Sequence, residues 1–303
     1  MRFTRTLSAL AATGALLAGG LVAAPVAQAA PTVDGRVSSA SLTWGVKSSF
    51  RSYVKGKIAK GSITVSGGAK QAANNGAFTF TSGSGSVLSG KGTVTFKGAV
   101  KFTGHKGQMN LALSDVKVQL AGGGKGYLVA DAKAPKSKLT KAISLNNKRI
   151  ATVKVATSKA SGGKVALKIT SVKLTSDGSK ALAGFYPAGT VVDSASVSGK
   201  YAARVASKTS VAASSFKKGT KPAATLTVAR LSTKAYPTGK VTVSWTIGGK
   251  VTKKSYTLKA ANKGKLKVTA PKTSRTAVKV KVSYAGNTAA KASASKTLTI
   301  KTR

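Results

Sequence analysis

The feature that most constrains the fold is a period-two alternation of apolar and polar residues over short stretches. Large apolar residues recur at every second position between turns rich in Gly, Ser and Lys, as in Phe78/Phe80, Val94/Phe96, Val100/Phe102, Leu111/Leu113, Val116/Val118/Leu120 and Val153/Val155. Successive side chains of a strand point to opposite faces, so this pattern buries one face and leaves the other in water. The sequence predicts a mainly β fold with antiparallel strands in its N-terminal half.

The alternation continues in the last 80 residues, in shorter segments at a spacing typical of a β-sandwich. The predicted strands are Thr225–Leu231, Lys240–Ile247, Ser255–Lys259, Gly264–Thr269, Ala277–Tyr284 and Lys296–Lys301. The string Tyr236-Pro237-Thr238-Gly239 and the turn after Tyr284 resemble bacterial immunoglobulin-like repeats of surface proteins. We therefore predict an immunoglobulin-like sandwich over residues 225–303, which serves for spacing or wall attachment.

The chain divides into further segments on composition. Residues 1–29 carry Arg2 and Arg5, an apolar stretch and Ala27-Gln28-Ala29, which together are typical of a secretory signal peptide. Residues 30–205 form the predicted N-terminal domain, and residues 206–224, which are small, polar and basic, form a predicted linker. No later apolar run approaches the ~20 residues of a membrane span. We expect a secreted protein, retained at the cell wall or released, without a transmembrane segment.

Charge is the most unusual property of the composition. The 303 residues include 51 Lys and Arg against 5 acids, so the formal net charge is +46. There is no Glu, no Cys and one histidine, and the acids are Asp34, Asp115, Asp131, Asp177 and Asp193. This inventory excludes a catalytic carboxylate pair, a zinc cluster, a thiolate nucleophile and a disulfide framework, so we expect a binding protein and no enzyme. The spread lysines predict attraction to anionic wall polymers, whereas export argues against nucleic acid as a partner in vivo.

One segment departs from the strand pattern. From Gly45 to Lys57, the residues Val46, Phe50, Tyr53 and Val54 follow helical spacing, and Lys47, Arg51 and Lys55 recur at every fourth position. This pattern predicts a short amphipathic helix with a basic flank. Tyr53 lies on the same side as Phe50, so its hydroxyl needs a partner at a surface or pocket.

Two strings together resemble the HtaA family of secreted actinobacterial haem-uptake proteins. The first runs from Leu42 to Val54 and includes Trp-Gly-x-Lys-x-Ser-Phe-x-x-Tyr, and the second runs from Val100 to His105 and ends in Phe-Thr-Gly-His. The resemblance covers roughly residues 33–204. It implies that Tyr53 is the axial ligand of ferric haem and that His105 hydrogen-bonds to it. It also implies transfer of haem to another carrier or to a membrane haem transporter.

The chemistry of such a site is consistent with these residue types. Ferric iron favours an anionic oxygen ligand, and tyrosinate is a known haem ligand. A hydrogen-bond donor on the phenolate helps it to ionise and fixes its orientation. Ser49 and Ser52, with the basic flank, are candidates for contacts to the haem propionates, and Phe50, Val54, Phe96 and Phe102 are candidates for covering the porphyrin.

Alternative interpretations remain open at each of these positions. Tyr53 on an apolar helix face is otherwise a packed residue with its hydroxyl at the rim, and His105 in a turn is otherwise a solvated loop residue. Phe96 and Phe102 fit an ordinary sheet core. At the level of function, the alternative is a cationic structural cell-surface protein that binds anionic wall polymers and carries no cofactor.

Overall fold

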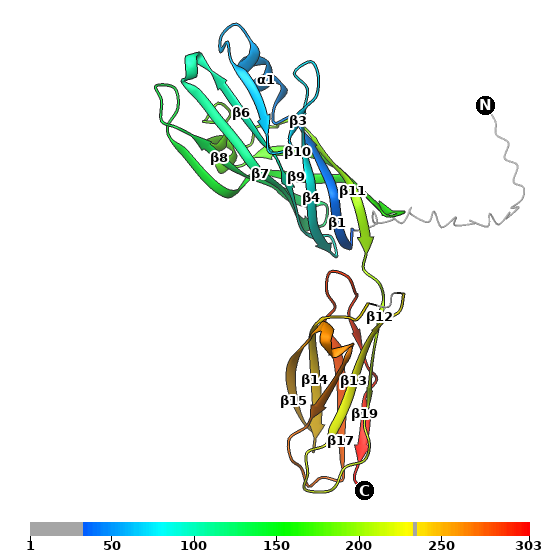
Figure 1. Cartoon of the computed structure of the whole chain (residues 1–303). Coiled ribbons are helices and arrows are strands. Elements are labelled where there is room, and N and C mark those ends of the chain that lie inside the picture. Colours follow the sequence, from blue (N-terminus) through cyan, green and yellow to red (C-terminus); the bar gives the residue numbers. More distant parts are fainter. Residues whose placement is uncertain (1–32, 233–234) are drawn as a thin grey trace, which may run out of the picture.

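The computed structural model describes residues 33–232 and 235–303, which form two β units, each with its own hydrophobic core (Figure 1). The predicted signal peptide, residues 1–29, lies outside the described residues. Within them, no helix is long and apolar enough to cross a membrane. The mainly β prediction is confirmed.

The first unit is one large antiparallel sheet that closes on itself. The strands follow the order β7-β5-β4-β1-β11-β10-β9-β8, and the ring closes because β8 also pairs with β7. β6 pairs with the first half of β7, and β2 pairs with β6. The strands are β1 (Gly35–Trp44), β2 (Ser62–Ser66), β3 (Lys70–Gln71), β4 (Phe78–Leu88), β5 (Lys91–Lys97), β6 (Ala99–Gly104), β7 (Met109–Gly122), β8 (Lys125–Ala134), β9 (Ile143–Ser161), β10 (Lys164–Leu174) and β11 (Ala195–Ala203). The short helices are α1 (Ser48–Lys55), η1 (His105–Gly107) and α2 (Ser176–Ala181).

The alternating apolar residues of the sequence form the core of this unit. Phe78, Phe80, Phe96 and Phe102 are all buried on the inner face, where each removes a large apolar area from water. In β7 the alternation changes phase after Leu113, and the strand has a register shift there with Asp115 at a φ of 51°. A bulge therefore absorbs one residue and keeps both halves of the strand facing the core.

The second unit consists of two sheets that share one core. The three-stranded sheet has the order β12-β13-β16, and the five-stranded sheet has the order β15-β14-β17-β18, with β19 also paired to β17. The elements are β12 (Ser207–Ala212), β13 (Ala223–Arg230), β14 (Gly239–Ile247), β15 (Lys250–Leu258), η2 (Ala260–Asn262), β16 (Lys265–Thr269), β17 (Ala277–Tyr284), β18 (Ser293–Ala294) and β19 (Leu298–Lys301). Leu226 and Val228 from one sheet and Val243, Trp245 and Val280 from the other are buried in this core. Assignment to the immunoglobulin-like class stays a prediction.

The structure differs from the sequence prediction at the start of the linker. Residues 207–212 of the predicted linker 206–224 form β12, which pairs with β13 along its length. Its inward side chains are mainly hydroxyls, and Ser207 and Thr209 both hydrogen-bond to Ser293 at 2.7 Å. Because hydroxyl pairs rather than large apolar residues hold this edge strand, it lacks the alternation that identifies the other strands.

An ion pair fastens the two ends of the first unit. Arg204, just after β11, donates from Nε and Nη2 to the two carboxylate oxygens of Asp34 at 2.9 and 3.0 Å, and the Ser89 backbone N–H donates to the same carboxylate at 3.0 Å. Burial of Asp34 opposes its ionisation, but these hydrogen bonds and the charges of Arg204 and Lys291 outweigh it and hold its pKa below the ordinary value of 3.8.

We predict an acid-dependent loss of stability from Asp34. A carboxyl whose folded pKa is lowered contributes stability above its unfolded pKa, and this contribution is lost as the pH falls through the folded pKa. Asp34→Asn should lower the free energy of unfolding at pH 7 by about 1–2 kcal/mol and should flatten its fall below about pH 4. Urea unfolding at both pH values measures this, with the exposed Asp115→Asn as control. An unchanged pH profile in Asp34→Asn would contradict the assignment.

Candidate functional site

The site is built around α1, which follows β1 through the short turn Gly45-Val46-Lys47. Val46 is buried and has a φ of 62°, which is a strained conformation for a β-branched residue. Its carbonyl accepts a hydrogen bond from the backbone N–H of Asp193 at 3.0 Å. The indole N–H of the buried Trp44 donates to the carbonyl of Asp193 at 3.2 Å. The segment before β11 therefore fixes where the helix begins.

The side chain of Asp193 holds the helix itself. One carboxylate oxygen accepts from the Ser48 backbone N–H at 3.0 Å, and the other forms an ion pair with Arg51 at 2.7 Å. A carboxylate at this position satisfies a free N–H of the first turn and complements the positive end of the helix. Arg51 also donates to the carbonyls of Gly45 and, at 2.9 Å, Asn75. We call the Arg51–Asp193 ion pair, together with the other hydrogen bonds of these two side chains, the clamp.

The clamp explains the glycine in the Trp44-Gly45 pair. A Cβ atom at Gly45 would collide with the Asp193 carboxylate and with the Arg51 guanidinium. Any side chain there would force the ion pair apart. The position needs glycine because the Asp193 and Arg51 side chains lie so close to its Cα atom.

The apolar side of α1 packs into the core. Phe50 and Val54 are 1% and 0% exposed, and the Phe50 ring lies 5.0 Å from that of Phe102 on β6. Phe102 is itself 0% exposed. These three residues are predicted to cover a porphyrin, and the structure places them beneath the surface, where Phe96 is buried as well. They support the helix from below rather than line a ligand surface.

Tyr53 and His105 meet at the surface next to this packing. The Tyr53 hydroxyl lies 2.5 Å from Nε2 of His105, although the two residues are 52 positions apart. Both side chains are half-buried. His105 begins η1 with a φ of 51°, and its backbone N–H donates to the carbonyl of Ala59 at 2.7 Å. The loop after α1 thus orients the histidine toward the tyrosine, and the phenol oxygen and the imidazole nitrogen share one hydrogen bond at the surface.

An exposed aromatic ring lies near the pair, and an exposed apolar side chain lies in the loop after α1, next to Ala59, whose carbonyl accepts from His105. The Phe185 ring is 38% exposed and lies 6.1 Å from the Tyr53 ring, and Ile58 is 75% exposed. Tyr186 lies 3.3 Å, oxygen to oxygen, from Ser49. The sequence interpretation missed Phe185 and Tyr186. The available signal was two adjacent aromatics in a Gly- and Pro-rich loop, which suggests an exposed aromatic pair but not what it faces.

The predicted polar contacts divide into two groups. Ser49 and Ser52 are exposed, and Lys47 donates to the carbonyl of Val191 at 3.2 Å with its ammonium 5.3 Å from the Tyr186 ring. Lys55 is exposed at the end of α1. Arg51, by contrast, is buried in the clamp, so the prediction that it forms part of a free basic flank is wrong.

The described residues contain no group of three or more His, Cys, Asp or Glu side chains that could hold a bare metal ion. The donor set at the surface is one phenol and one imidazole. It fits a metal whose remaining coordination comes from its own ligand, as in a porphyrin, better than a free cation.

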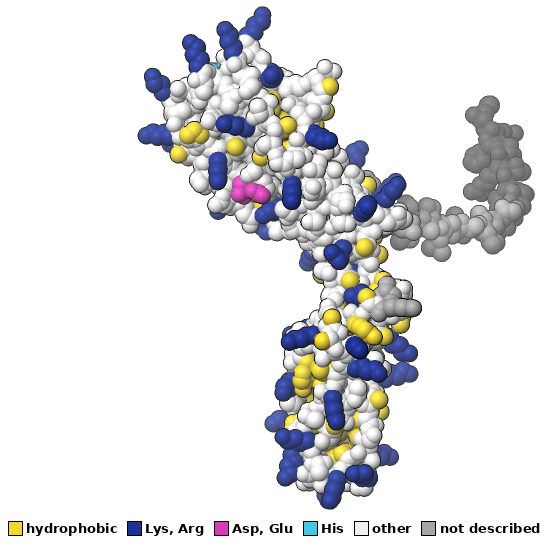
Figure 2. Space-filling model, viewed as in Figure 1, with side chains coloured by type: hydrophobic (Ala, Val, Ile, Leu, Met, Phe, Trp, Pro, Cys, Tyr) yellow, Lys and Arg dark blue, Asp and Glu magenta, His cyan; other side chains and the backbone are white. Residues whose placement is uncertain are grey.

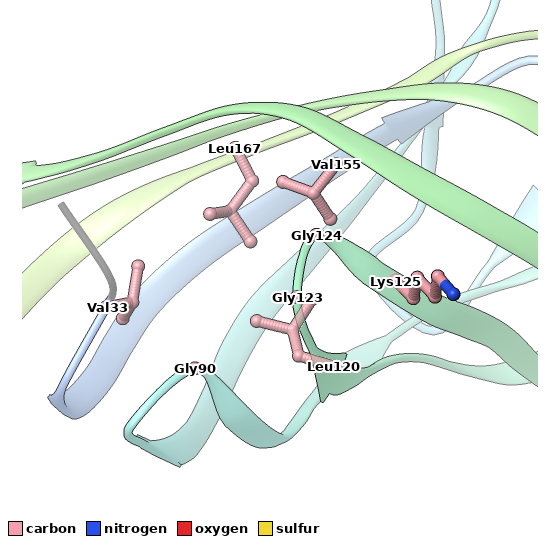
Figure 3. Close-up of a pocket in the computed structure, with 8 residues that line it drawn as sticks. All are labelled: Val33, Gly90, Leu120, Gly123, Gly124, Lys125, Val155 and Leu167. Carbon is pink, nitrogen blue, oxygen red and sulfur yellow. The ribbon is translucent and has the colours of Figure 1, made fainter. Parts of the chain in front are cut away.

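A cavity elsewhere in the unit does not compete for this role. It has a volume of about 50 Å³ and lies between the turns at Gly90 and Gly123, with Val33, Val155 and Leu167 on its walls (Figure 3). Such a volume holds only a few water molecules. None of its lining residues belongs to the surface formed by Tyr53, His105, Ile58 and Phe185, which we call the Tyr53 surface.

Comparison with known proteins agrees with the geometry. The family model described as HtaA matches residues 39–198, which is more than half of the chain, and the chain belongs to the HtaA family. It is similar to the C-terminal domain of HtaA from Corynebacterium glutamicum, with 30% identity over 55% of this chain and 99% of that domain and a TM-score of 0.50. It is also similar to the N-terminal domain of HtaA from that organism, with 32% identity, the same shares and a TM-score of 0.48.

A further similar structure is the heme binding protein HtaB from Corynebacterium glutamicum. It has 22% identity over 55% of this chain and 95% of that chain, with a TM-score of 0.43. No curated protein matches the chain.

We predict that the clamp contributes strongly to the stability of the first unit. Arg51→Met removes the hydrogen bonds to a charged group, so the free energy of unfolding should fall by about 2–3 kcal/mol. The control Lys55→Met, on the exposed side of the same helix, should change it by less than about 0.5 kcal/mol. Urea unfolding followed by circular dichroism measures both. Equal midpoints for Arg51→Met and the wild type would show that the clamp does not stabilise the fold.

Proposed function

We propose that this protein binds ferric haem at the Tyr53 surface, with the Tyr53 phenolate as the axial ligand. The observation that carries the proposal is the 2.5 Å contact between the Tyr53 hydroxyl and His105 Nε2, two half-buried side chains at the surface. Family membership supports it, because the HtaA resemblance implies haem uptake. When bound, haem supplies a ferric iron with an open axial position, a flat apolar face and two propionates.

Each residue of the surface has a distinct part in this proposal. Tyr53 offers the oxygen ligand, and His105 donates to that oxygen, which stabilises the anionic form and fixes the ring. Phe185 and Ile58 offer apolar contact for the porphyrin face, and this replaces the predicted roles of Phe50, Val54 and Phe102 as direct contacts.

The polar residues beside the helix are suited to the propionates. Ser49 and Ser52 are exposed hydroxyl donors. Lys47, just before α1, and Lys55, at its end, supply positive charge at the two ends of the helix. Lysines at the surface attract carboxylates at modest strength, and salt screens this attraction.

The openness of the surface supports a carrier role. Phe185 and Ile58 are exposed, and Tyr53 and His105 are only half-buried. A ligand on such a face remains accessible to a second protein, so we propose that the chain relays haem to another carrier or to a membrane haem transporter. Export through a signal peptide, with the protein retained at the wall or released, completes this proposal.

Replacing the ligand tyrosine tests the proposal. Titration of the mature protein with ferric haem at high salt, followed by visible absorption, should saturate at one haem per chain with a high-spin tyrosinate-type spectrum. Tyr53→Phe removes the ligand oxygen but keeps the ring, so this spectrum should disappear. Tyr127→Phe, on β8, is the matched control and should behave as the wild type. High salt is needed because so strongly cationic a chain attracts propionates without a specific site. The same non-saturating binding in all three proteins would refute the proposal.

Replacing the histidine separates ligation from its support. His105→Asn keeps a residue that tolerates the left-handed conformation at this position, but removes the imidazole. Haem should still bind through Tyr53, with affinity lowered by about 10- to 100-fold, the range for loss of such a supporting hydrogen bond, and with a shifted absorption spectrum. An unchanged affinity and spectrum would show that His105 does not act on the ligand.

A further inference from the structure

We propose that the outer face of the β15-β14-β17-β19 sheet binds a linear polyol-phosphate polymer of the kind that anionic cell walls contain. This site lies in the second unit and does not rest on the proposed haem function. The composition predicts attraction to anionic wall polymers only for the chain as a whole. This proposal places that attraction on one defined surface.

The second unit contains no acidic residue. All five acids of the chain lie at or before Asp193, whereas residues 206–303 include 22 Lys and Arg. Among the described residues, the ion pairs between side chains are Arg51–Asp193, Lys180–Asp177 and Arg204–Asp34, all in the first unit. Figure 2 shows many dark blue Lys and Arg side chains, and no magenta Asp or Glu, on the visible face of the second unit, which is the lower one in this view. Such a field attracts a polyanion and releases its counterions on binding.

The strand register places five lysines on one face. Residues directly opposite in antiparallel strands share a face, and Lys253 on β15 and Lys281 on β17 both pair with Ser244 on β14. Lys279 pairs with Thr246 in the next such row. Lys240 and Lys301 lie on the same face by the same alternation, and all five are exposed.

The spacing of these lysines suits a chain of phosphates. Lys253 and Lys281 are two strand spacings apart, or about 9.5 Å between backbones, and Lys279 and Lys281 are about 7 Å apart along β17. Hydroxyl residues occupy most of the positions between them, namely Thr242, Ser244, Thr246, Ser255 and Ser283, and Val251 is an exposed apolar residue on the same face. Lysine ammonium groups contact phosphate oxygens, and the hydroxyls can contact both phosphates and polyol hydroxyls.

The same face lacks what nucleic acids require. Its outward positions carry no aromatic ring on which a base can stack and no arginine to contact a base edge. Trp245 and Tyr284 point inward and are buried. A flexible polymer without bases therefore fits the face better than DNA or RNA.

The three-stranded sheet provides a matched comparison. Its outer face carries Lys208, Lys265 and Lys267, set opposite Ala229, Thr227 and Thr225. With three lysines against five, it should engage fewer phosphates at once. The Tyr53 surface is remote from both sheets, because α1 lies at the end of the first unit away from the second (Figure 1).

The test compares two triple variants of the mature chain that lose the same charge. Lys253→Gln, Lys279→Gln and Lys281→Gln alter the proposed face, and Lys208→Gln, Lys265→Gln and Lys267→Gln alter the other. Binding to purified poly(glycerol phosphate) is measured by calorimetry between about 50 and 200 mM salt. The first variant should bind more than about tenfold more weakly, and its slope of log K against log salt should fall by about two. The second should bind within about threefold of the wild type.

Three results would overturn the proposal. Equal losses in both variants would mean that the charge acts diffusely, without a preferred face. Wild-type binding to single-stranded DNA as tight as to poly(glycerol phosphate) would point to nucleic acid. Equal binding to polygalacturonate of matched charge would mean that phosphate is not recognised. Unchanged unfolding midpoints and haem titrations in both variants keep this test separate from folding and from the haem proposal.

Discussion

The contact between Arg51 and Asp193 determines the position of the candidate site. Asp193 sits in the segment before β11 and reaches the first turn of α1, so it connects the end of the first unit to the start of its helix. Without this contact, α1 would be eight residues of marginal helix after a strained turn. With this contact, the direction of α1 is fixed. Tyr53 on the helix then meets His105, which directly follows β6. The site therefore depends on an ion pair that contacts neither Tyr53 nor His105.

Much of the fold could be predicted from the sequence because period-two alternation reports directly on burial. The inner faces of β5, β6, β14 and β17 follow it closely, and β7 follows it on both sides of its bulge. The helix was also predictable, since Phe50 and Val54 follow helical spacing. β12 was not, because hydroxyl pairs hold it instead of apolar residues.

The site was predictable only in part. The pairing of Tyr53 with His105 was an expectation from family resemblance, since no spacing rule brings together residues 52 positions apart. The helical pattern placed Phe50 on the correct side but could not tell a core contact from a ligand contact. Arg51 looked like a surface charge, because a periodic pattern cannot reveal that a distant carboxylate buries it. Phe185 lies in an irregular loop, where neither periodicity applies.

We propose that the Tyr53 oxygen binds ferric haem iron. Resonance Raman spectroscopy of the ferric complex, excited in the phenolate-to-iron charge-transfer band, tests it most directly because it detects the coordinated ring itself. We expect phenolate modes in the wild-type complex, retained in Tyr127→Phe and absent from Tyr53→Phe. Phenolate modes that persist in Tyr53→Phe, or a wild-type complex without them, would contradict it.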